Sequence, residues 1–205
     1  MEQILKESIE NSINYSDYRR LMQKMVLDKF TTGNEVTEAN INYTMLNEKR
    51  MSRWDKKIEV QQDEESKIKA FNTEVFWLVI TESWCGDAAH VLPVMNKVAE
   101  LNPNINLRIV LRDDNEDLMN LFLSNGSKSI PKLIMIDSES LGVLDVYGPR
   151  PSIATKLVED YKKEHGKLTP EFKEDLQRWY NKDKGQTTLK DLTKLLETYT
   201  LSFSL

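Results

Sequence analysis

A buried strand that leads directly into a lone cysteine constrains the fold of this chain more than any other feature. The run from Val75 to Thr81 is β-branched and aromatic, as is typical of a central strand buried on both faces. Ser83-Trp84-Cys85-Gly86-Asp87-Ala88 follows, and then a helical stripe of apolar residues at 91, 92, 95, 98 and 101. Cys85 is the only cysteine among 205 residues, so no disulfide can form within the chain.

The residues after this helix continue to alternate between strand and helix patterns. Strands are predicted at 107–111, 132–136 and 142–147, and helices at 116–123 and from 152 to about 165. The resulting order is strand, helix, strand, helix, strand, strand, helix. This order predicts an α/β fold, with a central mixed sheet flanked by helices and a hairpin at one edge.

Helical patterns also flank this central part on both sides. Residues 4–30 form an apolar stripe with a break near 14–17, and a second helix over 38–58 brings Met45, Leu46, Met51 and Trp54 to one side. This side either packs on the sheet, which we favour, or binds a partner. Thr169-Pro170 starts a helix, and another follows a turn at 184–186. The last helix either docks on the core or forms an oligomer contact, and the oligomeric state stays open.

These patterns predict three parts: an N-terminal helical extension over 1–54, a central α/β domain over 55–165 and a C-terminal helical extension over 166–205. With 28 basic and 33 acidic residues and a net charge of -5, the chain offers no basic stripe for a nucleic-acid partner. No apolar run approaches the roughly 20 residues of a membrane span, and the N-terminus lacks an export signal pattern. We therefore expect a cytoplasmic protein without a membrane partner.

Patterns for metals and cofactors are missing. Two histidines and one cysteine cannot furnish a zinc site, and the chain has no glycine-rich phosphate loop. The acidic run 113–117 lacks the glycine spacing of a calcium loop, so we interpret it as a solvated turn that caps the next helix. The sequence therefore predicts no metal and no cofactor.

Four local features, in this order of elements, resemble the thioredoxin family. Trp84-Cys85-Gly86 matches the start of the family's active-site motif, and Pro93 falls where the family kinks its active-site helix. Ile130-Pro131 matches the family's isoleucine and cis-proline, which face the active-site sulfur, and Gly148 fits the glycine beyond the hairpin. The resemblance covers roughly residues 55–165. Together with the flanks, it resembles a bacterial thioredoxin group marked by Trp-Cys-Gly-Asp and extended at both ends.

Three departures from the family pattern bear on activity. Ala88 stands where the family has its resolving cysteine, and Asp87 replaces the proline that tunes the redox potential. Val79 occupies the place of the buried aspartate that accepts a proton during resolution. The resemblance therefore excludes a dithiol cycle, because one sulfur can form a disulfide only with another molecule.

The local chemistry of Cys85 is expected to be mixed. The sequence places it in the first turn of a helix, which favours a thiolate, but the carboxylate of Asp87 opposes that effect. We therefore expect a thiol pKa near the free value of about 8.5. Asp87 is also interpreted as a helix-capping carboxylate. His90 is expected to be exposed on the helix and not to pair with the cysteine.

Two hypotheses of function follow. In the first, Cys85 is the catalytic residue of a monothiol exchange protein in redox homeostasis: it reacts with client protein thiols or disulfides, and a low-molecular-weight thiol resolves the product. Trp84, Gly86, Asp87 and Ala88 would be its active-site neighbours. In the second, the chain is a non-catalytic binding module, which docks a partner in a groove formed by Trp84, Ile130 and Pro131. Trp84 would either contact that partner or close the end of the sheet.

Overall fold

The computed structural model describes residues 1–202 and alternates helices and strands around a single sheet. Its elements are α1 Glu2–Glu10, α2 Tyr15–Leu27, α3 Glu38–Lys57, α4 Gln62–Ala70, β1 Val75–Thr81, α5 Ala88–Leu101, β2 Ile105–Leu111, α6 Glu116–Leu121, β3 Lys132–Asp137, β4 Val143–Tyr147, α7 Ser152–His165, α8 Pro170–Asp183 and α9 Gln186–Ser202. The predicted strand at 75–81 and the predicted helix at 152–165 have the observed bounds.

The sheet is mixed and has the order β2-β1-β3-β4. β1 pairs in parallel with β2, as a strand-helix-strand crossover requires. β3 pairs antiparallel with β1, and β4 forms the predicted edge hairpin with β3. The central α/β pattern is therefore confirmed, and β1, from which the Cys85 segment leaves, lies inside the sheet.

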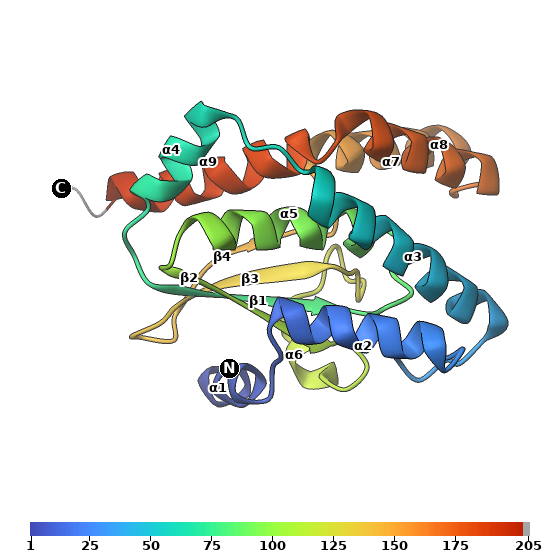
Figure 1. The fold of residues 1–205 in the computed structure, drawn as a ribbon, viewed down its shortest axis with the longest axis horizontal. Helices are drawn as coiled ribbons and strands as arrows, with labels where there is room; N and C mark the ends of the chain where they lie inside the picture. Colours follow the sequence, from blue (N-terminus) through green and yellow to red (C-terminus); the bar gives the residue numbers. More distant parts are fainter. Residues whose placement is uncertain (203–205) are drawn as a thin grey trace.

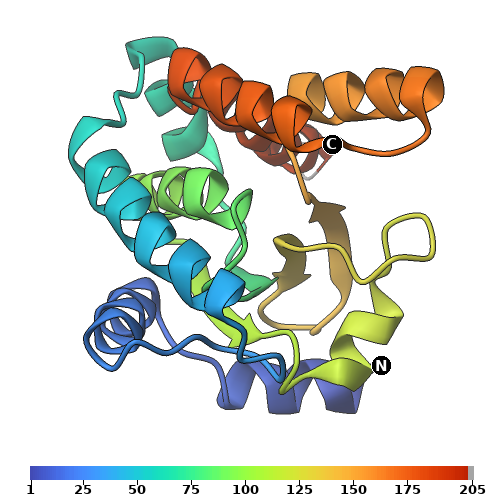
Figure 2. The same cartoon turned by 90° about the vertical axis from the view of Figure 1, so that its right-hand side faces the viewer.

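Helices cover both faces of this sheet (Figure 1). α5 and α9 lie on one face, while α1 and α6 lie together on the other. Figure 2 shows α2 at the β2 edge and β4 at the opposite edge. The C-terminal extension belongs to the core, because Leu189, Leu192 and Leu196 of α9 are fully buried in the same apolar cluster as the sheet. None of the described helices is long and apolar enough to cross a membrane.

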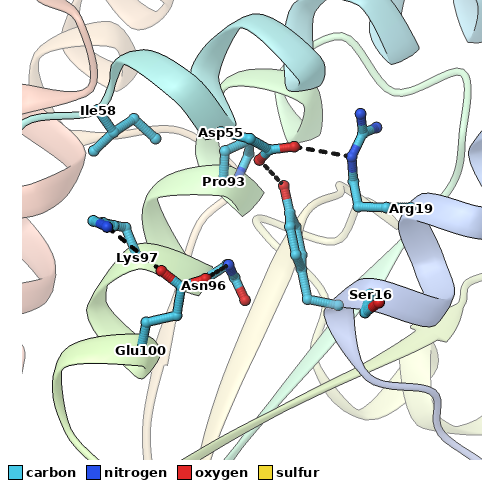
Figure 3. Close-up of a pocket in the computed structure, with 9 residues that line it drawn as sticks. Ser16, Arg19, Asp55, Ile58, Pro93, Asn96, Lys97 and Glu100 are labelled. Carbon is cyan, nitrogen blue, oxygen red and sulfur yellow. Dashed lines mark hydrogen bonds and ion pairs between the residues drawn. The ribbon is translucent and has the colours of Figure 1, made fainter.

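The N-terminal helices are fixed to the sheet and to each other by polar contacts. Between α1 and α2, Ile13 exchanges two backbone hydrogen bonds with Ile109 of the edge strand β2, at 2.9 and 2.8 Å. Asp55 of α3 accepts from the Tyr15 hydroxyl at 2.6 Å and pairs with the Arg19 guanidinium at 3.1 Å (Figure 3). These contacts hold α2 against α3, and α3 in turn packs on α5, the helix that follows the Cys85 segment.

Two sequence-based expectations about the helices are wrong, and one helix was not predicted. α4 was not predicted, because its nine residues bury only Ile68 and so present no apolar stripe. Leu46 was placed on the packed side of α3 with Met51 and Trp54, but it is 43% exposed. α5 begins at Ala88, so Cys85 lies in the turn before the helix and not in its first turn.

Candidate functional site

Cys85 lies in a closed turn between β1 and α5. Its backbone N–H donates to the Glu82 carbonyl at 3.1 Å, and its own carbonyl accepts from Ala89 at 3.3 Å. The residue is only 7% exposed, and its thiol donates to the backbone carbonyl of Ile130 at 3.3 Å. The thiol is therefore largely shielded from solvent.

The environment of Cys85 keeps its sulfur protonated. Burial, together with the nearby carboxylate of Asp87, raises the pKa of Cys85 to about 12. The backbone N–H groups of Ala88 and Asp87 and the guanidinium of Arg150 oppose this shift without cancelling it. The expected thiol pKa near 8.5 is therefore too low. The expectation failed because the sequence does not reveal how completely the turn is covered.

Two residues after Cys85, Asp87 forms a buried ion pair. Its carboxylate meets the Arg150 guanidinium at 2.8 Å and accepts from the Tyr180 hydroxyl at 2.9 Å. Asp87 is the N-cap residue of α5, but its side chain makes no capping hydrogen bond, so the capping role predicted for its carboxylate is wrong. Burial raises the pKa of the Asp87 carboxyl, and Arg150 and Tyr180 oppose that rise. The pair joins the start of α5 to α8 and to the loop after β4.

His90 extends this polar cluster and is also buried, at 4% exposure, which corrects its predicted exposed position. Its Nδ1 faces the Trp54 Nε1–H at 2.9 Å, and its Nε2 faces the Gln177 Oε1 at 2.8 Å. Because indole can only donate, Nδ1 is the acceptor and the proton resides on Nε2. The ring stacks on Tyr180 at 4.3 Å. Burial lowers the pKa of His90 to about 4, so the ring is neutral at pH 7.

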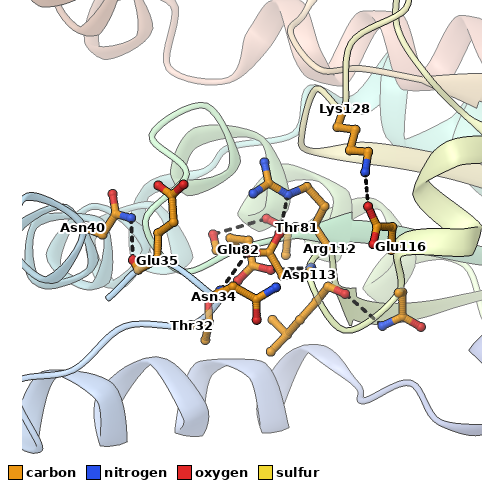
Figure 4. Close-up of polar contacts among 12 residues, drawn as sticks. Thr32, Asn34, Glu35, Asn40, Thr81, Glu82, Arg112, Asp113, Glu116 and Lys128 are labelled. Atoms are coloured by element: carbon orange, nitrogen blue, oxygen red, sulfur yellow. Dashed lines mark hydrogen bonds and ion pairs between the residues drawn. The ribbon is translucent and has the colours of Figure 1, made fainter. Parts of the chain in front are cut away.

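Before Cys85, Glu82 forms a second buried polar cluster (Figure 4). Its side chain is fully buried, with one oxygen accepting from the Thr32 hydroxyl and the other from the Asp113 backbone N–H at 2.9 Å. Burial raises the pKa of this carboxyl, against the effect of both donors. Asp113 in turn pairs with Arg112 at 2.7 Å and accepts from the Asn34 N–H at 2.8 Å. Asp113 is thus anchored, whereas Asp114, Glu116 and Asp117 of the same run are exposed, as the predicted solvated turn requires.

The adjoining hydroxyl groups tie the N-terminal extension to the same turn. Ser83 donates its backbone N–H to the Thr32 hydroxyl at 2.8 Å, and its own hydroxyl lies 2.8 Å from that of Thr44. Asn47 of α3 donates to the Ser83 carbonyl at 2.9 Å. Gly33 has a φ of +84°, and a side chain there would begin 2.7 Å from an Asp113 oxygen. A glycine is therefore required where the extension crosses the turn.

Of the residues predicted to form a groove, Ile130 accepts from the thiol, Pro131 follows Ile130 in the chain, and Trp84 precedes the cysteine. Ile130 is 7% exposed and Pro131 is buried, and the bond between them is cis. Gly148 lies so close to the Pro131 carbonyl that any side chain would collide with it. The partly buried ring of Trp84 packs under Arg112, whose guanidinium carbon lies 4.9 Å from the ring centre. The backbone of Gly148 is therefore packed directly against Pro131.

Comparisons with known proteins agree with this architecture. A family model described as thioredoxin matches residues 33–162. This chain belongs to the thioredoxin family. The fold of this thioredoxin-family protein is similar to that of a protein of unknown function from Pseudomonas aeruginosa, with 15% identity, a TM-score of 0.66 and coverage of 95% of this chain and 97% of that chain. An HIV epitope-scaffold is also similar, with 16% identity, a TM-score of 0.66 and coverage of 94% and 97%. No curated protein matches.

The structure places several residues beside the Cys85 turn that the sequence analysis did not identify. The thiol hydrogen bond brings Cys85 against Ile130, which Pro131 follows in the chain. Trp84, Gly86, Asp87 and Ala88 adjoin Cys85 in the sequence. Glu82, Arg150 and Tyr180 were not predicted as site residues. Arg150 and Tyr180 bond to Asp87, and Glu82 bonds to Thr32. One available signal was Glu82 itself, since a carboxylate directly after a fully buried strand must find hydrogen-bond donors.

Proposed function

We propose that this protein is a protein-binding module that uses the thioredoxin fold without thiol-disulfide chemistry in its resting state. The burial of Cys85, with its thiol donating to Ile130, carries this proposal. A thiol with a pKa near 12 is almost entirely protonated at pH 7, and the thiolate is the species that attacks a disulfide. The thiol is therefore a poor nucleophile, and its replacement should leave binding unchanged.

The proposed docking site is the groove formed by Trp84, Ile130 and Pro131. A sulfhydryl is a weak donor, so an incoming peptide N–H can replace Cys85 on the Ile130 carbonyl or share that oxygen with it. The partner would then be an extended segment of another protein that pairs through its backbone. We place this activity in the cytoplasm, in line with the sequence.

Monothiol exchange is the second candidate. The N–H groups of Ala88 and Asp87 and the charge of Arg150 all act to lower the pKa of Cys85, as a nucleophile requires. In this reaction the Cys85 thiolate attacks a client disulfide, forms a mixed disulfide and releases the client's other sulfur as a thiolate. The thiolate of a low-molecular-weight thiol then attacks the mixed disulfide and releases Cys85. A partner would first have to open the turn.

Alkylation of the single cysteine distinguishes the two candidates. We expect iodoacetamide to label the native protein at pH 8 more than about a hundredfold more slowly than the urea-unfolded chain. We also expect the native rate to rise about tenfold for each pH unit through pH 10, because the thiol pKa lies above that range. Fast labelling that levels off below pH 8 would instead support monothiol exchange.

Partner capture from a cell extract provides the functional test. The Cys85→Ser variant should capture the same proteins as the wild type, and the Trp84→Ala variant should lose most of them. Phe172→Ala is a matched control, because it also removes a partly buried aromatic ring, but from the start of α8. Capture that depends on Cys85 and is reversed by a reductant would contradict the binding proposal.

A further inference from the structure

A pocket of about 690 Å³ lies between α3 and the turn that joins α8 to α9. The Arg53 guanidinium donates to the Asn181 side-chain oxygen on one side, and the Gln186 amide donates to the Glu59 carbonyl at 3.0 Å on another. The charged and polar lining comes mainly from Arg53, Lys56, Lys57, Glu59, Asn181 and Lys184. Hydrogen bonds between these elements thus frame the pocket.

The charges of this pocket are unbalanced. Four cationic side chains face it, against the single carboxylate of Glu59. Within residues 1–202, none of the four forms an ion pair with a carboxylate within 4.0 Å. The 250 Å³ pocket of Figure 3 differs, because its cations Arg19 and Lys97 pair with Asp55 and Glu100 at 3.1 and 3.5 Å. The excess positive charge is thus local, on a chain whose net charge is -5.

The same helix faces continue from this pocket toward Cys85. Arg50, Arg53 and Lys57 recur at helical spacing on α3. Gln177 and Asn181 do so on α8, and Lys184 follows directly after the end of that helix. At the inner end, Arg50 Nη1 and Gln177 Nε2 lie 3.7 and 4.0 Å from the position that a Gly86 side chain would take. Seven residues of helix span about 10 Å, which is the length of about three residues of extended peptide.

We propose that the pocket between α3 and α8 binds an acidic segment of the partner protein, with its carboxylates against Arg53, Lys57 and Lys184. This inference rests on the proposed function, since the acidic residues would flank the segment that docks beside Cys85. The lining favours a peptide over a nucleotide, because Trp54, the aromatic residue of that lining, is only 5% exposed and offers no face for a base.

A pair of tetrapeptides tests this proposal on the full chain. Acetyl-(Glu)₄-amide should bind in low salt, with a dissociation constant below about 5 mM, while acetyl-(Gln)₄-amide should bind at least about fivefold more weakly. The Lys57→Gln/Lys184→Gln variant should weaken binding of the acidic peptide about fivefold to tenfold. Lys6→Gln/Lys163→Gln removes the same charge from exposed sites on α1 and α7 and should change binding less than about twofold.

Other outcomes would overturn the proposal. Equal affinity for the two peptides, no binding up to 5 mM, or equal loss in the two double variants would exclude a specific acidic site. Tighter binding of pyrophosphate or citrate than of the acidic peptide would assign the pocket to small anions. Failure here leaves Trp84-dependent capture intact if the proposed function holds. If the acidic peptide binds but partner capture does not depend on Trp84, the proposed docking groove is rejected and the acidic site is kept.

Discussion

The segments on either side of Cys85 each bury one carboxylate, and they stabilise it in different ways. After the cysteine, Asp87 meets the formal charge of Arg150 and the hydroxyl of Tyr180. Before it, Glu82 is held by the hydroxyl of Thr32 and a backbone N–H, while Arg112 pairs with Asp113 instead. One side of the turn depends on an ion pair and the other on neutral donors.

This difference predicts how each side responds to the loss of charge. Removing one member of a buried ion pair leaves the other charge buried alone, which is costly. Removing the charge of a carboxylate held by neutral donors leaves no opposite charge behind, and it relieves the desolvation that raises the pKa of Glu82. Replacing Asp87 by asparagine should therefore reduce stability strongly, whereas replacing Glu82 by glutamine should reduce it little.

Asp87→Asn should have the largest effect, lowering the free energy of unfolding by about 3 to 4 kcal/mol at pH 7. The asparagine still accepts from Tyr180, but its NH₂ group or a neutral oxygen then faces Arg150. One quarter of the Arg150 side chain is exposed, which keeps the loss below that of a fully buried pair. Urea denaturation measures the change.

The matched comparison is the double variant Asp87→Leu/Arg150→Met, which removes both charges and should lose less stability than Asp87→Asn. If Asp87→Asn costs less than about 1 kcal/mol, water screens the pair as it does a surface salt bridge, and the contrast between the two sides disappears.

His90 adds a pH dependence to the Asp87 side. Its folded pKa of about 4 lies below the ordinary 6.5, so folding favours the neutral ring. The resulting stabilisation is fully present above pH 6.5 and is lost as the pH falls from 6.5 toward 4. Between pH 7 and 4.5, the wild type should lose about 2 to 3 kcal/mol relative to His90→Gln.

The comparison with His90→Gln isolates this ring from the buried carboxyls. Burial raises the folded pKa of Asp87 and of Glu82, so their contributions have the opposite sign and are lost as the pH rises through those raised values. Denaturation curves for both proteins at the two pH values test the prediction. Parallel losses in the two proteins would show that protonation of His90 costs the fold nothing.

Sequence periodicity predicted the framework because local residues determine it. The run at 75–81 is apolar at every position but the last, and the stripe of α7 is regular, so their bounds could be predicted. α4 buries one side chain and leaves no such pattern. The proximity of Ile130 to Cys85 came from family resemblance, which compensates for the long separation of these residues in sequence.

The polar clusters could not be predicted because each depends on distant partners. The hydroxyl that bonds Asp87 belongs to Tyr180, 93 residues away, and the hydroxyl that bonds Glu82 belongs to Thr32, 50 residues away. A charged residue at the start of a helix is usually exposed, so a local interpretation favoured capping for Asp87 and exposure for His90. Docking of α8 reverses both expectations.

Glu82→Gln should cost about 1 kcal/mol or less at pH 7, in contrast to Asp87→Asn. The amide oxygen can keep the Asp113 N–H, and the Thr32 hydroxyl can turn to accept from the new NH₂ group. The difference from the wild type should grow in favour of the wild type at pH 4.5, where Glu82 is more often protonated. A loss of 3 kcal/mol at pH 7 would show that the negative charge itself is required.

Cys85→Ser should have the smallest effect, less than about 1 kcal/mol, because the serine hydroxyl can donate to the Ile130 carbonyl in place of the thiol. For a chain of this size, that corresponds to a shift of less than about 4 °C in the unfolding midpoint. Neither buried carboxylate bonds to the sulfur, so both polar clusters should persist. Thermal unfolding of Cys85→Ser alone and combined with Asp87→Asn tests this independence. If the two losses are strongly non-additive, the thiol couples the sides of the turn, and they cannot be treated as separate regions.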